Sequence, residues 1–109
     1  MGDIMQPSRD IVLEALRDVI DPELGYNIVD LGLVYALKVA DSIVHITMTM
    51  TTPSCPAQDY IMMAVCERGL RIPGVKDVDV TLVWEPRWSP VKMVPAARTY
   101  FDIPDDPHE

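Results

Sequence analysis

An alternating pattern between residues 43 and 51 constrains the fold of this chain more than any other feature. Four apolar residues alternate with one histidine and three threonines over eight successive positions (Val44, Ile46, Met48 and Met50 against His45, Thr47, Thr49 and Thr51). A period of two is typical of a β-strand with one face on a core. The aliphatic stretch 33–39 precedes it, and only the short polar break 40–42 lies between them. The two stretches therefore predict an antiparallel hairpin.

Residues 8–20 predict an amphipathic helix. Its apolar side chains recur at the spacing of one helix face, and its charged side chains gather on the opposite face. Ser8 is a suitable N-cap. Asp21-Pro22 is expected to end the helix, because a residue before proline is disfavoured in the helical conformation.

Residues 56–68 predict a second helix, which begins at Pro56 and ends before Gly69. This helix is apolar on nearly every side. A helix without a polar face is usually covered on more than one side. We therefore expect it to form the interface of a homodimer.

A third strand is predicted at residues 78–84, where apolar and polar side chains alternate again. The order helix, strand, strand, helix, strand predicts a compact α+β domain, with the helices packed on one face of a small three-stranded mixed sheet. We expect a single domain at 8–101, between an N-terminal tail at 1–7 and an acidic, disordered tail at 102–109. The segment 85–95 holds three prolines, so we expect no regular structure there.

Charge and composition exclude several classes of protein. The 109 residues carry nine basic and seventeen acidic side chains, a net charge of −8. This charge argues against nucleic acid and anionic membranes as partners. No apolar run reaches the roughly 18 residues of a membrane span, and residues 1–6 lack the pattern of a secretory signal. With two cysteines and no disulfide framework, we expect a cytoplasmic protein.

Cys55 is the residue best suited to chemistry. It follows a Thr-Pro-Ser turn and precedes Pro56, at the predicted start of the second helix. Unpaired backbone N–H groups at a helix N-terminus favour a thiolate, which is both a metal ligand and a nucleophile. The alternative is a buried cysteine that fills a small apolar space.

The second cysteine, Cys66, is a poor partner for the first. It lies eleven residues further along the same predicted helix, or about 16 Å, which is too far for a disulfide or a shared metal. We expect Cys66 to be a core residue. One thiolate per chain does not hold a metal or cluster tightly, so such a site needs ligands from a second subunit, from a carboxylate or histidine elsewhere, or from a partner.

Three polar side chains have both a functional and a plainer interpretation. Asp21 and Glu23 either offer two carboxylates on a rigid turn or are only solvated charges after a helix. His45 lies on the threonine face of its strand. We expect it to be a surface or half-buried histidine rather than a ligand.

The segment around Trp84, Trp88 and Met93 is also open to two interpretations. These side chains either line an apolar cleft or close a small core. The chain has no glycine-rich phosphate loop and no Cys-x-x-Cys pair, so a stand-alone zinc or redox site is not expected.

Four motifs, taken in order, resemble one known family. They are Asp21-Pro22-Glu23, Val29-Asp30-Leu31-Gly32-Leu33-Val34-Tyr35, Thr51-Thr52-Pro53-Ser54-Cys55-Pro56, and Trp84-Glu85-Pro86-Arg87-Trp88-Ser89-Pro90 with Met93. Over residues 8–93 this order and spacing resemble the SufT-like and PaaD-like family of iron–sulfur cluster assembly proteins. The resemblance implies an α+β fold shared with other cluster-assembly domains. It also implies a role in maturing iron–sulfur proteins rather than turnover of a small substrate.

The same resemblance implies roles for particular residues. Cys55 matches the reactive cysteine of the family, and Asp21 and Glu23 match its acidic turn. Thr52 and Pro53 match the approach to the cysteine. The cysteine-rich C-terminal segment of PaaD proteins has no counterpart here, which favours the SufT-like branch, and residues 94–98 replace the charged helix of many relatives.

Three functions remain open from the sequence. The first is a dimeric cytoplasmic maturation factor for client apoproteins, in which Cys55, assisted by Asp21, Glu23 and Thr52, transiently binds or passes iron or a cluster. The second is a small thiol-dependent enzyme with Cys55 as nucleophile and a carboxylate or His45 as base. The third is an adaptor without chemistry that docks client proteins through its acidic surface and residues 84–93.

Overall fold

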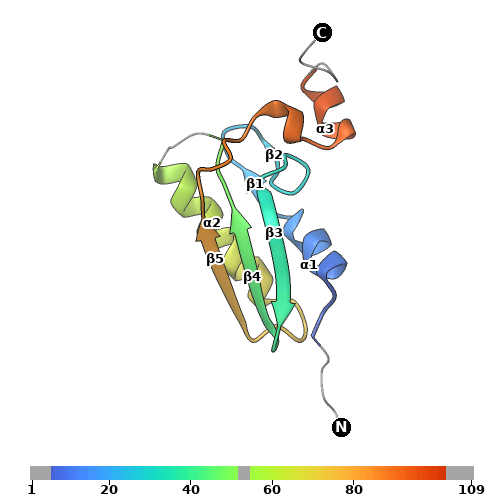
Figure 1. The fold of residues 1–109 in the computed structure, drawn as a ribbon, viewed down its shortest axis with the longest axis vertical. Coiled ribbons are helices and arrows are strands. Elements are labelled where there is room, and N and C mark those ends of the chain that lie inside the picture. Colours follow the sequence, from blue (N-terminus) through green and yellow to red (C-terminus); the bar gives the residue numbers. More distant parts are fainter. Residues whose placement is uncertain (1–5, 52–54, 103–109) are drawn as a thin grey trace.

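The computed structural model describes residues 6–51 and 55–102 (Figure 1). In chain order, its elements are α1 (Arg9–Leu16), β1 (Ile20–Asp21), β2 (Tyr26–Asn27), β3 (Val34–Ala40), β4 (Ile43–Met48), α2 (Cys55–Leu70), β5 (Asp77–Leu82), the 3-10 turn η1 (Pro90–Lys92) and α3 (Pro95–Tyr100). The predicted α-β-β-α-β order is confirmed. Within this part of the chain, no helix is long and apolar enough to cross a membrane.

The main sheet has three strands in the order β3-β4-β5. β3 and β4 form the predicted antiparallel hairpin, and β5 pairs with β4 in parallel, which confirms the mixed sheet. The helices α1 and α2 contact each other and lie on one face of this sheet (Figure 1). α2 is the crossover helix that connects β4 to the parallel strand β5. The parallel pairing places the carboxyl ends of β4 and β5 at the same edge.

The alternation in β4 has its predicted effect on burial. Val44, Ile46 and Met48 are buried in the core, whereas His45 and Thr47 are half-buried on the open face. The strand is shorter than predicted, because ladder pairing ends at Met48. Beyond that point the core closes over the chain, and the next two residues are both buried instead of alternating.

The first helix is also shorter than the predicted 8–20. Ser8 is its N-cap, as predicted, and accepts a hydrogen bond from the backbone N–H of Ile11. The helix ends at Leu16, where the following N–H groups bond three residues back and tighten the last turn. Ile20–Asp21 then pairs with Tyr26–Asn27 as a small antiparallel ribbon, where the sequence indicated a helix end and a loop.

The second helix does not end before Gly69 as predicted but continues to Leu70. A Cβ at Gly69 would lie 2.8 Å from Val78 Cγ2. This glycine therefore lets α2 lie close to β5. The core-facing side of α2 includes Ile61 and Val65, while other apolar side chains of the helix are exposed, such as Met63.

The C-terminal segment is bound to the loop before β3. The N–H of Val94 donates to the Asp30 carbonyl at 2.9 Å. A Cβ at Gly32 would clash with the Lys92 carbonyl oxygen, so only glycine fits beneath this segment. Residues 85–94 hold only a 3-10 turn, close to the prediction for 85–95. The helix α3 then begins at Pro95, where no helix was predicted. The predictions for 1–5 and 103–109 lie outside the described residues.

Candidate functional site

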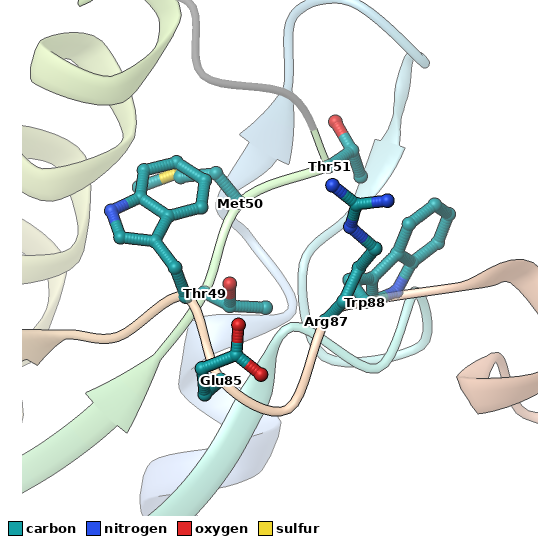
Figure 2. A pocket seen from close by; sticks show the side chains of 7 residues that line it. Thr49, Met50, Thr51, Glu85, Arg87 and Trp88 are labelled. Carbon is teal, nitrogen blue, oxygen red and sulfur yellow. The ribbon is translucent and has the colours of Figure 1, made fainter.

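A pocket of about 360 Å³ lies beyond the carboxyl ends of β4 and β5 (Figure 2). Seven residues from the segments that follow these two strands line it: Thr49, Met50, Thr51, Trp84, Glu85, Arg87 and Trp88. The parallel pairing of β4 with β5 brings the two segments together. The pocket therefore joins the segment before Cys55 to the proline-rich segment after β5.

The wall that follows β5 is held by hydrogen bonds from the loop before β3 and from β3 itself. Trp88 Nε1 donates to the Leu31 carbonyl at 2.7 Å, and the Tyr35 hydroxyl donates to the Pro86 carbonyl at 2.7 Å. On the other wall, the N–H of Thr49 donates to the Leu33 carbonyl at 2.9 Å. The stretch 29–35 thus holds both walls, so the pocket is largely formed before any ligand binds.

Asp21 connects the acidic turn to the rim of this pocket. Its carboxyl group is buried, and Oδ1 accepts hydrogen bonds from the N–H groups of Glu23 at 2.8 Å and Leu24 at 3.3 Å. Oδ2 accepts a bond from Thr51 Oγ1 at 3.3 Å. Glu23 itself is exposed. The structure therefore brings the acidic turn and the segment that leads to Cys55 together.

Cys55 is the first residue of α2, and Thr52 and Pro53 lie outside the described residues. Cys55 follows Thr51, at the pocket rim, by four positions. A chain of that length spans at most about 14 Å. The helix start therefore lies within that distance of the pocket rim.

Cys66 is half-buried, which corrects the expectation that it belongs to the core. It lines a shallow apolar surface on α2 with Met62, Met63 and Leu70. The pKa of its thiol is raised, first by burial and second by the negative charge of Asp77. A protonated thiol is a weak nucleophile and a weak metal ligand.

His45 lies on the open face of the sheet, as expected. Its side chain is 43% exposed, and Nδ1 lies 3.3 Å from Asp79 Oδ2 on β5. It precedes Thr49 by four residues, or about 13 Å of extended chain. Across residues 6–51 and 55–102, no group of three or more His, Cys, Asp or Glu side chains is placed to hold a metal ion.

The tryptophan segment closes the core, but the cleft beside it is not the apolar one expected, because Thr49, Thr51, Glu85 and Arg87 also line it. Met93 is buried and closes the core, whereas Trp84 and Trp88 line the pocket. The sequence did not indicate Thr49 or Arg87 as site residues. Thr49 looks like any other polar residue of the alternation, and only its place after the last paired residue could have indicated burial.

Another buried carboxylate that the sequence did not indicate as functional supports the loop below the pocket. Asp30 accepts bonds from an Arg17 guanidinium nitrogen at 2.7 Å and from Asn27 Nδ2 at 3.1 Å. Its N–H in turn donates to Asn27 Oδ1. This network fixes the backbone whose carbonyls hold Trp88 and the C-terminal segment.

Known proteins are similar to this chain in sequence and in fold. A family model described as "Iron-sulfur cluster assembly protein" matches residues 9–82. An Fe-S protein maturation auxiliary factor of Porphyromonas gingivalis is 44% identical over 89 residues, which cover 81% of this chain and 84% of that protein. The Fe-S protein maturation auxiliary factor YitW of Bacillus subtilis is 43% identical over 96 residues, or 87% of this chain and 94% of that protein. A crystal structure of a domain of unknown function from Bacillus anthracis matches with a TM-score of 0.79 and 38% identity, over 87% of this chain and 92% of that chain.

Proposed function

The chain belongs to the iron–sulfur cluster assembly protein family, and we propose that it is a maturation factor that acts on iron–sulfur client apoproteins through the thiol of Cys55. The observation that carries the proposal is the hydrogen bond from Thr51 to the buried Asp21 carboxylate. This bond fixes the start of the segment that leads to Cys55. Two relatives, each matched by this chain over most of its length, are named as such factors.

The position of Cys55 supports a reactive thiol. It is the first residue of a 16-residue helix. The unpaired N–H groups of a helix N-terminus carry partial positive charge, which favours a thiolate over a thiol. Thiolates are the usual protein ligands of iron–sulfur clusters.

The cargo on this site would be iron or a cluster, held only in passing. A cluster takes about four protein ligands, whereas the chain has two cysteines and they lie eleven residues apart on one helix. We propose that the missing ligands come from a second copy of the chain or from the client apoprotein. The exposed apolar side chains of α2, including Tyr60 and Met63, would support a homodimer at this point.

The acidic turn and the threonines have supporting roles in this proposal. Asp21 positions the cysteine segment, because both of its carboxylate oxygens already accept hydrogen bonds. Glu23 has the exposed carboxylate of the turn and would assist an iron ion, and Thr52 would shape the approach to the thiol. We expect the protein to do this in the cytoplasm.

The test compares the two cysteines in one assay. Cys55→Ala and Cys66→Ala are each expressed in a bacterial strain that lacks its own maturation factor, and the activity of an iron–sulfur enzyme is measured. Loss of rescue with Cys55→Ala and full rescue with Cys66→Ala is the expected result. Thermal unfolding of both purified variants checks that a loss of rescue does not come from misfolding.

Full rescue by Cys55→Ala would remove the thiol from the mechanism. An adaptor without chemistry would then explain the data best, provided that charge reversal on the acidic surface abolishes rescue. Anaerobic reconstitution with iron and sulfide, followed by visible absorption, separately measures whether Cys55 binds the cargo. Absorption that is unchanged in Cys55→Ala would contradict binding at this residue.

A further inference from the structure

The floor of the pocket contains a polar group that no described residue satisfies. Thr49 is 1% exposed, lines the pocket, and its Oγ1 has no hydrogen-bond partner within the described chain. A buried hydroxyl without a partner costs free energy, and nearly all such groups in proteins are satisfied. A ligand that enters the pocket would supply the missing partner.

Two opposite charges line the same pocket without neutralising each other. Glu85 and Arg87 both belong to its lining, and neither forms an ion pair with another residue of the described segments. Figure 2 shows the Arg87 guanidinium directed toward Thr51, whereas the Glu85 carboxylate is directed toward Thr49. The pocket therefore has a positive end and a negative end.

This polarity selects among ligands. A simple anion would be attracted by Arg87 but repelled by Glu85, and a simple cation would meet the reverse. A ligand with a carboxylate and an ammonium group satisfies both ends, with charge-assisted hydrogen bonds at each. The Thr49 hydroxyl, on the Glu85 side, would bond the ligand's polar groups there.

The size and walls of the pocket set the rest of the ligand. A volume of about 360 Å³ lies at the small end of the range for small-molecule sites. Trp84, Trp88 and Met50 also line the pocket and supply its apolar surface. We propose that this pocket binds a small zwitterion with an apolar side chain, as a free amino acid or a dipeptide.

Ligand binding can be followed without a label, because the chain has two tryptophans and both line the pocket. Intrinsic tryptophan fluorescence of the full chain therefore reports the pocket alone. The probes are L-leucine, L-methionine, L-leucyl-L-leucine, N-acetyl-L-leucine and L-leucinamide. We expect saturable changes with the first three, and affinity weaker by on the order of tenfold for the last two, which each lack one charge.

The ligand series shows whether the natural ligand is a free amino acid or a peptide. Tighter binding of L-leucine than of the dipeptide identifies a free amino acid, and the reverse order identifies a peptide. If none of the zwitterions gives a saturable change at millimolar concentration, the proposal is overturned. Equal affinities for L-leucine and its two singly charged derivatives would also overturn it, because the charges would then play no part.

Variants separate binding from folding. Arg87→Gln should weaken L-leucine about tenfold but should not weaken L-leucinamide, since that probe has no carboxylate and its ammonium group is repelled by the Arg87 charge. Arg71→Gln is the matched control: Arg71 is exposed and lies outside the pocket, in a groove with Ile72 and Pro73. It should leave all affinities unchanged.

Thr49→Val removes the unpartnered hydroxyl at nearly constant shape. It should weaken L-leucine several-fold while the protein becomes no less stable to urea, a combination that a purely structural role for the hydroxyl would not give. Unchanged affinity would refute the part assigned to Thr49. These measurements use neither iron nor Cys55, so their failure leaves the proposed maturation function to its own test.

Discussion

Asp21 and Thr51, thirty residues apart in the chain, are joined by a 3.3 Å hydrogen bond from the threonine hydroxyl to a carboxylate that is 1% exposed. The same carboxylate accepts two backbone bonds that shape the turn at 22–24. A single buried side chain therefore sets both the acidic turn and the rim of the pocket. The Asp21 carboxylate therefore acts mainly by positioning these two segments.

Asp21→Asn should destabilise the fold by about 1–3 kcal/mol, because the amide cannot fully replace the acceptors of a buried carboxylate. Thr51→Val should cost less, since it removes only one bond. The double variant should cost less than the sum of the two, because the first change already breaks the shared bond. Urea unfolding of all three measures this coupling, and strict additivity would show that the bond contributes nothing.

Thr49→Val should raise the free energy of unfolding by about 1 kcal/mol, because it removes a buried hydroxyl without a partner. Thr47→Val is the control, since Thr47 is half-buried on the open face of β4, just before Thr49. That change should lie within about 0.5 kcal/mol of zero. A loss of stability at position 49 would mean that the hydroxyl has a partner after all.

Gly32→Ala should be strongly destabilising, by more than about 2 kcal/mol, because the added Cβ would meet the Lys92 carbonyl and the residue has a φ of +82°. Gly25→Ala provides the comparison. Gly25 also has a positive φ, +69°, but a Cβ there would have nothing within 4 Å. It should cost only about 1 kcal/mol, the backbone strain alone. Similar losses at both sites in urea unfolding would show that the C-terminal segment yields easily.

The pH dependence of Cys66 is measurable once the other thiol is removed. In a Cys55→Ala background, alkylation of Cys66 should rise with a midpoint above the ordinary thiol pKa of 9.0, because burial and Asp77 raise the pKa of this group. Asp77→Asn should lower the midpoint by removing the negative charge. A midpoint at or below the ordinary value, unmoved by that change, would contradict both causes.

The same raised pKa has a consequence for stability. A thiol that is harder to ionise in the folded state binds its proton more tightly there than in the unfolded chain. Its contribution is therefore complete below the unfolded pKa, near 9.0, and is lost as the pH rises through the folded pKa. As the pH rises above about 9.0, the urea concentration at half-unfolding should fall more steeply for Cys55→Ala than for a variant that also carries Cys66→Ala.

The sequence predicted those features that depend on neighbours in the chain. The period of two in β4 and the N-cap at Ser8 are local patterns, and both are confirmed. The mixed sheet followed from the order of elements. Thr49 was missed because its burial depends on where ladder pairing stops rather than on its own alternation.

The features that the sequence did not predict depend on long-range contacts. Gly69 looked like a helix stop, but its role is set by Val78 on another element. The early end of the first helix reflects the pairing of Ile20–Asp21 with a later ribbon strand. The roles of Cys55, Asp21, Glu23 and Thr52 remain predictions, which the cysteine and reconstitution experiments test.

The carbonyl of Lys92 occupies the space that a side chain at position 32 would fill, and Met93 and Ala97 are buried just beyond it. The hydrophobic interior therefore extends past the last strand of the sheet. A chain cut after β5 would keep all five strands and the helices α1 and α2 but would lose two buried side chains of the core, Met93 and Ala97. We therefore expect a fragment that ends at β5 to be less stable than one that continues to Ala97.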